Sequence, residues 1–568
     1  MRVRYSLDRF CFSQNPHVCL SSEGSFFLSG LVHNTSAYHG LSFLSDELVP
    51  QKCIHAFVPQ NRFSHARINP SRVQRLTLDS CEESFFSQGM FCARLRNVSP
   101  TKILLDGRRL DDFSQEGRFH SIELISASPW IYRISSSGGV FILASSVQLD
   151  IIDNWVSVDV SFDTRRNDRR GWWVHERFSI PSCPEARIVC SPEKQFSSSI
   201  FFSSVWTEKL ILSRNPEKEF LSASLKGLTL SSRPAILAGF PWFTQVWARD
   251  EAISVGGLLA QKEFFLAKNI LLRQLSSLLP SGFLANRYPE SSVGSADGVG
   301  WCIVRLQQLF SNAVDVFSHS DLLFVHTQLQ SIVQQLFATR FTDGHIINYS
   351  QETWMDTLGG VNDTRSGVRI EIQALTLAIL SFGIQVSSHL QKDDSCFTKH
   401  YSSLLQNTRS LKKGAILSDG LKDTTVRPNI ALAAYVFPQL FTQAEWEEVF
   451  DAAIQKLYLP WGALSTIQKD HSWYQEMHSG ISDSSYHRGD TWFWVNNLFA
   501  LVLQRVNEQK YEKVISRILD ASLYDLFSGG GCLGACSEIS SARQYEPLGC
   551  WSQAWSAATL LELLVSFE

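Results

Sequence analysis

The spacing of hydrophobic and polar residues divides the chain into two parts. Residues 1 to about 190 contain short apolar or alternating segments, among them 25–28, 140–143 and 155–160, with polar and turn-forming stretches between them. Such segments are typical of β-strands, and a long succession of them favours a sandwich of two sheets. We therefore expect a β-rich, sandwich-like N-terminal domain over residues 1–195.

Apolar residues recur at helical spacing from about residue 200 onward. This periodicity predicts helices over residues 252–259, 264–279, 304–317, 322–337, 372–390, 430–440, 446–457, 492–506 and 554–564. About 370 residues of mainly helical pattern match the size of a toroid of paired helices, whereas a TIM barrel would need eight parallel strands. We expect a second, all-α domain over residues 196–568, so that the protein is multi-domain.

The composition excludes several classes of protein. A length of 568 residues exceeds one ordinary hydrophobic core and predicts more than one domain. The 51 basic and 55 acidic residues leave a net charge of -4, which offers little attraction for a polyanion. We therefore expect no binding to nucleic acid or to an anionic membrane.

The N-terminal residues and the cysteines bear on the compartment. Polar and charged residues follow residues 1–5 where a secretory signal would have an apolar core, and no apolar run approaches the roughly 20 residues that span a bilayer. The 12 cysteines show no framework spacing, so we expect reduced thiols and a cytoplasmic location. Cys532, Cys536 and Cys550 lack the paired spacing of structural zinc sites, so we expect no metal and no cofactor.

Aromatic residues are abundant, with 16 Trp, 13 Tyr and 38 Phe. Trp and Tyr rings stack on the apolar C–H faces of sugars, and a large aromatic core explains the same abundance equally well. The aromatic content by itself leaves both explanations open.

Two carboxylates stand in aromatic-rich loops. Asp356 ends the segment Thr-Trp-Met-Asp, and Glu538 lies in the segment Ser-Glu-Ile. Breaking a glycosidic bond requires two such groups, one to protonate the leaving oxygen and one to activate water or attack directly. An aspartate beside Trp354 is partly desolvated, which raises its pKa and suits an acid near neutral pH. The alternative for Asp356 is a turn or a helix cap.

Three further motifs carry polar or aromatic side chains of candidate interest. Arg249 and Asp250 lead into a predicted helix, and their guanidinium and carboxylate form a clamp for hydroxyls, although a helix cap with a salt bridge explains the same pair. His487 lies among aromatic residues, where it binds a hydroxyl or serves as a structural histidine. Gln553 and Trp555 open the last predicted helix.

Nine motifs occur in an order that resembles one protein family. They are Gly-Phe-Pro-Trp-Phe with Trp-Ala-Arg-Asp at 239–250, Asn-Arg-Tyr at 286–288, Asp297 with Trp301, Thr-Trp-Met-Asp at 353–356, Arg-Ile-Glu-Ile-Gln-Ala-Leu at 369–375, Arg-Pro-Asn at 427–429, Tyr-His-x-Gly-x-x-Trp-x-Trp at 486–494, Ser-Glu-Ile at 537–539 and Gln-Ala-Trp-Ser at 553–556. Over about residues 200–568 the chain resembles the amylo-α-1,6-glucosidase domain of glycogen debranching enzymes. A fainter resemblance, carried by Ser29-Gly30 and residues 34–41, is to the N-terminal domain of the bacterial and archaeal enzymes.

The resemblance implies an (α/α)6 toroid and inverting hydrolysis of α-1,6-linked glucose in glycogen or another branched α-glucan. It implies that Asp356 is the general acid and Glu538 the general base, and that Arg249 and Asp250 hold the terminal glucose. The other positions that it places at the substrate are Trp242, Trp247, Asn286, Asp297, Trp354, Glu371, His487, Gln553 and Trp555. It implies no cofactor.

The chain departs from the family pattern at three positions. Ala248 and Glu251 replace a glycine and a threonine around the Arg-Asp pair, so we expect an extra carboxylate to crowd the clamp. Arg488 replaces a glutamine beside His487. These departures bear on substrate range and activity level more than on the reaction class. No α-amylase-type barrel precedes the domain, so we expect no transferase activity from this chain.

Two alternatives to α-1,6-glucosidase activity stay open. A glucoamylase-like exo-hydrolase of α-1,4 links would use the same toroid and the same clamp. A glucan-binding protein that has lost catalysis would explain the departures, but the presence of both Asp356 and Glu538 argues against it. Release of glucose from a singly branched oligosaccharide, compared with a linear one, separates the three.

Overall fold

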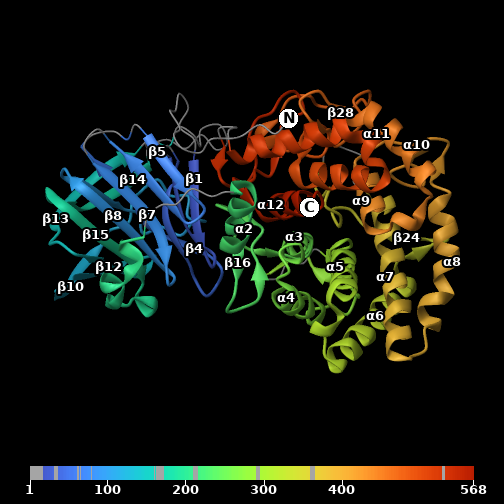
Figure 1. The fold of residues 1–568 in the computed structure, drawn as a ribbon, viewed down its shortest axis with the longest axis horizontal. Helices are drawn as coiled ribbons and strands as arrows, with labels where there is room; N and C mark the ends of the chain where they lie inside the picture. Colours follow the sequence, from blue (N-terminus) through green and yellow to red (C-terminus); the bar gives the residue numbers. More distant parts are fainter. Residues whose placement is uncertain are drawn as a thin grey trace. The chain divides into compact units, whose positions relative to one another are not determined.

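The computed structural model describes residues 17–30, 36–60, 63, 65–77, 80–158, 160, 172–208, 215–288, 294–358, 365–527 and 531–568. Residues 1–5 and 34–35, on which the expectations about a signal sequence and part of the N-terminal motif rest, lie outside these ranges. The chain forms two compact units, drawn in Figure 1. The first comprises Met1–Leu230, Gly239–Thr244 and Asp525–Ala535, and the second comprises Ser231–Ala238, Gln245–Tyr524 and Cys536–Glu568.

Within the described residues, the first unit contains two eight-stranded sheets. One sheet has the order β13 (Asp150–Val158), β14 (Trp172–Ile180), β9 (Thr101–Leu105), β4 (Pro50–Pro59), β3 (Gly40–Leu44), β2 (Ser25–Gly30), β1 (His17–Ser22) and β31 (Cys532–Leu533). The other has the order β10 (Ser121–Ala127), β11 (Trp130–Ser136), β12 (Gly139–Ser145), β15 (Cys183–Pro192), β8 (Met90–Val98), β7 (Cys81–Ser87), β6 (Arg72–Leu76) and β5 (His65–Asn69). Neighbouring strands run antiparallel, whereas β1 and β31 pair in parallel.

Aromatic side chains from the two sheets pack against one another. The ring centroids of Phe27 on β2 and Phe57 on β4 lie 4.7 and 6.4 Å from that of Phe91 on β8. Tyr132 on β11 and Phe178 on β14 lie 5.2 Å apart. Contacts of this kind bury the facing sides of the two sheets, and the central strands β2 and β4 are buried along most of their length. The expected β-rich N-terminal region is confirmed.

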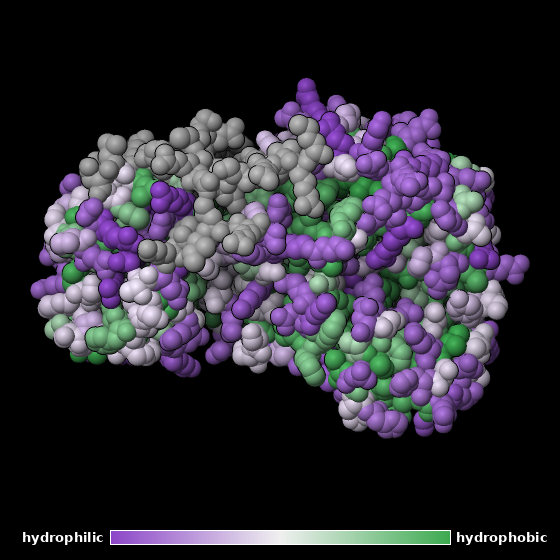
Figure 2. Space-filling view, viewed as in Figure 1, coloured by the Kyte–Doolittle hydropathy of each residue, from purple (hydrophilic) through white to green (hydrophobic). Residues whose placement is uncertain are grey.

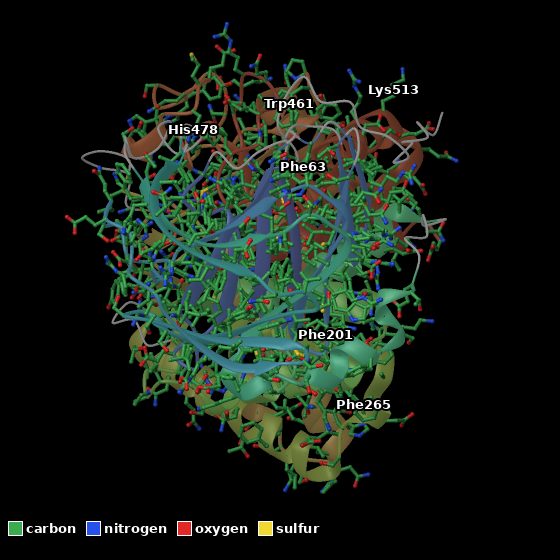
Figure 3. The ribbon with its side chains drawn as sticks, turned by 90° about the vertical axis from the view of Figure 1, so that its left-hand side faces the viewer. Phe63, Phe201, Phe265, Trp461, His478 and Lys513 are labelled. Carbon is green, nitrogen blue, oxygen red and sulfur yellow. The ribbon has the colours of Figure 1, made fainter. Side chains whose placement is uncertain are left out.

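Two short helices cover part of the second sheet. Phe201 in η2 (Ser198–Phe202) and Trp206 in η3 (Ser204–Trp206) pack with Phe85 of β7, and Figure 3 labels Phe201 against the strands. The indole N–H of Trp206 donates to the carbonyl of Ile200 at 2.7 Å, which closes this segment on itself. Helix α2 (Pro216–Leu228) follows and packs on β1.

The helices of the second unit fall into two sets. One set is buried on nearly every side and comprises α3 (Ala248–Ala260), α5 (Gly298–Ala313), α7 (Ile370–Leu390), α9 (Asn429–Val436) and α12 (Ala554–Val565). The other set has one buried face and comprises α4 (Phe264–Ser276), α6 (His319–Thr339), α8 (Ser395–Arg409) and α10 (Gln443–Leu457). Helix α11 (Phe493–Phe527) is kinked at Asn507, where the backbone leaves helical geometry.

The buried helices pack in succession, α3 on α5, α5 on α7 and α7 on α9, and the last helix, α12, returns to pack on α3. Helices α4, α6 and α8 contact this set from outside, at α5 and α7 (Figure 1). Figure 2 shows hydrophilic side chains interspersed with smaller hydrophobic areas over the visible outer face of this unit. The expected helical region is confirmed.

Helix α7 departs from the expectation that no segment is long and apolar enough to cross a membrane. Its 21 residues meet that test by length and composition, and 83% of its apolar stretch is buried inside the protein. Its polar residues Glu371, Gln373 and Thr376 are buried as well. A helix that is apolar on all sides is expected at the centre of a large helical unit.

The sequence pattern missed α2, α8 and the second half of α11. In α8 the buried side chains are Phe397, Leu404 and Thr408, with charged and polar residues between them. Three buried positions in 15 residues produce too weak an apolar periodicity to detect, because most stability of such a helix comes from packing on its neighbour.

Candidate active site

The sequence motifs gather where the buried helices begin. Three short strands lead directly into helices: β19 (Val246–Trp247) into α3, β30 (Thr491–Trp492) into α11 and β33 (Ser552–Gln553) into α12. The residues that precede α5, α7 and α9 are also motif residues, namely Asp297, Arg369 and Pro428. The loops between the helices and the first turns of the helices therefore carry the candidate residues.

Arg249 joins two of the predicted site aspartates. Its Nε donates to both carboxylate oxygens of Asp297 at 2.8 Å, and its Nη1 lies 3.6 Å from Oδ2 of Asp356. Burial disfavours the charge on Arg249, but Asp297 and Asp356 outweigh that effect and raise its pKa above the ordinary value. Ser295 also donates to Asp297 at 2.8 Å. Asp297 thus fixes the orientation of the Arg249 side chain.

Asp356 has the properties of a proton donor. Burial raises its pKa to about 6, Arg249 opposes that rise, and Asp297 adds to it. The side chain is 32% exposed, so a substrate can reach it. Its backbone carbonyl accepts from Gln351 at 3.0 Å. At neutral pH about a tenth of such carboxyl groups carry a proton, far more than for an aspartate with the ordinary pKa of 3.8.

Glu538 differs from Asp356 in that both of its carboxylate oxygens accept hydrogen bonds. It is buried, its Oε2 accepts from the backbone N–H of Cys550 at 2.7 Å, and its Oε1 accepts from the hydroxyl of Tyr486. Hydrogen bonds donated to a carboxylate favour its ionised form. Gly549, at φ +68°, leaves room for this arrangement, because a Cβ there would clash with Oε2. Glu538 therefore has the environment of a base.

Asp250 lies close enough to Asp356 and Glu538 for the charges of both to affect its pKa. Burial raises its pKa to about 8, Arg249 opposes the rise, and the charges of Glu538 and Asp356 are both close enough to add to it. Gln553 donates to its Oδ1 at 3.3 Å, across 303 residues of sequence. The structure therefore brings Arg249, Asp250, Asp356, Glu538 and Gln553 into one neighbourhood.

An aromatic cluster supports this neighbourhood. The ring of His487 is stacked on Trp492 at 5.1 Å and meets Trp354 edge-on at 5.4 Å, and Trp555 is stacked on Trp494 at 5.0 Å. Burial lowers the pKa of His487 well below its ordinary value, and Arg488 and other guanidinium groups add to the effect, so the ring is neutral. Its Nδ1 lies 2.8 Å from Oγ1 of Thr357.

Several buried polar atoms have no partner among the described residues. They include Nη2 of Arg249, Oδ1 of Asn286, Nε2 of His487, Oε1 of Gln553 and Nε1 of Trp555. Buried polar atoms are satisfied in the great majority of cases, so a group of exceptions needs an explanation. Such atoms also occur elsewhere in both units, for example in Glu82 and His345, but these five belong to residues that the sequence motifs place at the substrate. Donors and acceptors together match a polyhydroxylated ligand, whose hydroxyls both donate and accept.

Other predicted substrate residues occupy supporting positions. Trp354 is buried, and its indole N–H donates to Asn429 at 2.7 Å. Glu371 is buried and accepts from Arg365 at 2.8 Å. Trp247 precedes α3, and Trp242 belongs to the first unit, where its ring lies 5.3 Å from that of Tyr38.

Polar networks fasten the loop that carries Asp356. Arg365 donates to Thr353 at 2.9 Å and pairs with Asp419 at 3.0 Å. Asn429 donates to Asp419 at 2.7 Å and approaches the sulfur of Met355 at 3.7 Å. Thr353 is therefore held by Arg365, and Met355 contacts Asn429 at the start of α9.

The expectation that Glu251 crowds the Arg-Asp pair is wrong. Its carboxylate accepts from the backbone N–H of Ile236 at 2.9 Å, from Gln274 at 2.7 Å and from Arg273. Because a helix has about 3.6 residues per turn, adjacent residues of α3 point in different directions. Glu251 consequently joins α3 to α4 and has no part in the clamp.

Arg488, which replaces the glutamine of the family pattern, holds Thr357 in place. Its guanidinium donates to the carbonyl of Thr357 at 3.1 Å and contacts the hydroxyl at 3.4 Å. It therefore holds the residue that follows Asp356. Tyr486 was not among the predicted site residues, although it is the first residue of the motif at 486–494. In the described part of the chain, no group of three or more His, Cys, Asp or Glu side chains could hold a metal ion.

Replacing Asp250 with Asn is expected to lower kcat/KM by about tenfold or more, because a buried partner of the clamp is altered. It is also expected to raise Tm at pH 8 relative to the wild-type protein. The ordinary pKa of 3.8 rises to about 8 in the folded protein, so the folded state binds more protons across that window. The contribution of Asp250 to the free energy of unfolding therefore falls as pH rises from 3.8 towards 8. An asparagine does not titrate, so the variant should not show this decrease.

Thermal melts at pH 5 and pH 8 check this expectation. The exposed Asp315→Asn is the control, and its difference from the wild-type Tm should be the same at both pH values. An Asp250→Asn difference that does not grow between pH 5 and pH 8 would contradict the raised pKa. If the decline of kcat/KM with rising pH were absent from Asp250→Asn, Asp250 would be the proton donor and Asp356 a binding residue.

Comparison with known proteins gives one matching family and several similar solved structures. The model of the family described as amylo-alpha-1,6-glucosidase matches residues 216–562. The crystal structure of a bacterial glucoamylase complexed with acarbose is 10% identical, with 100% of this chain and 95% of that chain covered and a TM-score of 0.61. A mannosylglycerate hydrolase from Thermus thermophilus, crystallised with glucose, is 14% identical, with 61% of this chain and 99% of that chain covered and a TM-score of 0.49.

Proposed function

The chain belongs to the amylo-alpha-1,6-glucosidase family of glycoside hydrolases, and we propose that it hydrolyses the α-1,6-glucosidic branch links of glycogen or limit dextrin. The family match spans more than half of the chain and includes Arg249 at the start of α3 and the loops that carry Asp356 and Glu538. Its substrates on this proposal are branched α-glucans, and no cofactor is required.

We propose that the helices of the second unit form an (α/α)6 toroid. The succession α3, α5, α7 and α9, with α12 returning to α3, supports an inner ring, and the one-sided burial of α4, α6, α8 and α10 supports an outer one. The overall likeness to the bacterial glucoamylase fold agrees with this arrangement. In such a ring the loops before the inner helices meet at one end.

In the proposed mechanism Asp356 protonates the glycosidic oxygen as the bond to the anomeric carbon breaks. Glu538 removes a proton from the water that attacks the opposite face of the sugar. The observation that carries this assignment is the contrast between the two carboxyl groups. Asp356 has a raised pKa and a partly exposed side chain, whereas Glu538 accepts two hydrogen bonds that favour its charge.

Arg249 and Asp250 hold the terminal glucose on this proposal, assisted by Asn286, His487 and Gln553. The polar atoms of this group that lack partners among the described residues support it, because hydroxyls of a bound glucose would satisfy them. A neutral His487 can accept at Nε2 or donate from it, according to which ring nitrogen carries the proton.

Glucose release from substrates of defined structure tests the proposal. A maltooligosaccharide with a single α-1,6-linked glucose should be cleaved, and a linear maltooligosaccharide of the same size should not. Rapid cleavage of the linear compound would instead favour an α-1,4 exo-glucosidase, the function that the glucoamylase-like fold also accommodates. Binding without cleavage of either compound would indicate a glucan-binding protein.

The anomer released first is expected to be β-glucose. Inversion requires that the acid and base carboxyl groups lie about 6.5–9.5 Å apart, which leaves room for a water molecule. Proton NMR during the first minutes of hydrolysis distinguishes the anomers before mutarotation mixes them. Initial α-glucose would mean retention, and Glu538 would then be a nucleophile.

A further inference from the structure

Aromatic side chains are exposed at one end of the first unit, outside the candidate active site. The strands β13 and β10 end the two sheets in the described part of the chain and lie at the same end of the unit in Figure 1. Trp155 on β13, Trp173 on β14 and Phe119 before β10 are 37%, 44% and 63% exposed. Nothing in the proposed mechanism uses them.

The indole of Trp155 is held in a fixed orientation. Its ring is stacked on the buried ring of His175 at 4.3 Å with an angle of 2° between the planes, so one face is covered. The exposed area therefore comes from the opposite face and the edges. Gly117 permits this position, because a Cβ there would clash with Cζ3 of Trp155. Phe119 also contacts His175, at 5.5 Å.

Trp173 lies on the same face of the sheet as Trp155. In the pairing of β13 with β14, Trp155 is opposite His175 and Ser157 is opposite Trp173, without a bulge between these pairs. Paired residues share a face, and so do residues two positions apart on one strand. The two indoles are consequently diagonal neighbours, a separation that long aromatic side chains can span.

Charged groups border these rings. The carboxylate of Asp153 is 64% exposed and lies 2.8 Å from Nε2 of His175 and 3.1 Å from Nη1 of Arg177. Arg177 in turn lies 5.9 Å from the ring of Phe119. Flat apolar faces bordered by donors and acceptors match a pyranose ring, which has C–H groups on its faces and hydroxyls around its edge.

We propose that Trp155, Trp173 and Phe119 form a second glucan-binding site, which takes an outer α-1,4-linked chain of the polymer. This inference rests on the proposed function, because a polymeric substrate supplies many identical chains near the enzyme. Binding one chain there raises the effective concentration of the other chain ends at the active site. Three partly exposed aromatic side chains offer on the order of 300 Å², well short of the roughly 800 Å² per partner that a stable dimer buries.

Native gel electrophoresis through immobilised glycogen measures the affinity of this site. The double variant Trp155→Ala with Trp173→Ala should bind glycogen at least about tenfold more weakly, because each substitution removes an apolar contact face. Gly117→Ala should weaken binding as well, because it displaces Trp155 without removing an aromatic group. Phe202→Ala is the matched control, since Phe202 is 85% exposed in the same unit and should not affect binding.

Kinetics with short substrates separate this site from the active site. The double variant should cleave a singly branched oligosaccharide with unchanged kcat/KM, while its KM for glycogen rises about tenfold. A folded double variant with wild-type affinity for glycogen would overturn the proposal. A change in oligomeric state with unaltered glycogen affinity would also overturn it and make the surface a contact between copies of the chain.

The same experiments keep the two proposals distinguishable. Glycogen binding that depends on Trp155, in a protein that cleaves no branched oligosaccharide, would support the second site and contradict the proposed hydrolysis. Normal cleavage of the branched oligosaccharide, with glycogen affinity independent of Trp155, would support the proposed hydrolysis and contradict the second site.

Discussion

Asp356→Asn is expected to lower kcat on a branched oligosaccharide by about 10²–10⁴-fold, the usual contribution of a general acid. The amide has nearly the same shape but no transferable proton, so binding of glucan should stay within a few-fold of the wild type. In the wild-type enzyme kcat/KM should fall as pH rises above about 6, where Asp356 loses its proton. That decline should be absent from the residual activity of the variant.

A substrate with a better leaving group tests the role of Asp356 directly. α-Glucosyl fluoride needs little protonation when fluoride departs, so Asp356→Asn should hydrolyse it at a rate close to that of the wild type. A variant that is equally impaired on the fluoride and on the branched oligosaccharide would rule out proton donation by Asp356. Asp321→Asn, at the N-terminus of α6, is a control for the loss of a carboxylate elsewhere in the unit.

Glu538→Gln is expected to reduce turnover of both substrates by about 10²–10⁴-fold, because activation of water is needed whatever group departs. The substitution also replaces an acceptor that faces two donors. Either the hydroxyl of Tyr486 or the N–H of Cys550 would then face the new amide N–H₂, so a small loss of stability should accompany the loss of activity.

Two measurements distinguish the loss of a base from a folding defect. Tyr486→Phe removes one donor to Glu538 but leaves the carboxylate, so its loss of activity should be much smaller than that of Glu538→Gln. Azide added to Glu538→Ala should attack α-glucosyl fluoride and form β-glucosyl azide, since a small anion can occupy the vacated space. Recovery of α-glucosyl azide, or wild-type turnover in Glu538→Gln, would remove Glu538 from the role of base.

Part of the candidate site follows from local sequence. Arg249 lies in the first turn of α3 and the loop that carries Asp356 precedes α7, and the apolar periodicity of both helices is visible in the chain. Glu538 lies between two further predicted helices, α11 and α12. The expected rise in the pKa of Asp356 agrees with the structure, and so does its main cause, desolvation by burial. The added contribution from the charge of Asp297 was not expected, and Trp354 itself packs into an aromatic cluster.

Partners far apart in the chain could not be predicted from local patterns. Arg249 and Asp297 are 48 residues apart, and Asp250 and Gln553 are 303 apart, so their hydrogen bonds exist only after the helices have packed. The same holds for Glu251, which looked like a member of the clamp by its position next to Asp250. Its side chain points to Arg273 and Gln274 because successive residues on a helix face different neighbours.

The amino-acid sequence by itself determined the β-rich and helical halves, most helix positions and the family, because strand and helix periodicities and short motifs are properties of neighbouring residues. Tertiary structure alone decided that Asp250 also carries a raised pKa beside Arg249, that Glu538 is held by Tyr486 and Cys550, and which buried polar atoms lack a partner in the described residues. Those properties depend on burial and on distances between loops, such as those bearing Asp356 and Glu538, that only the packed helices bring together.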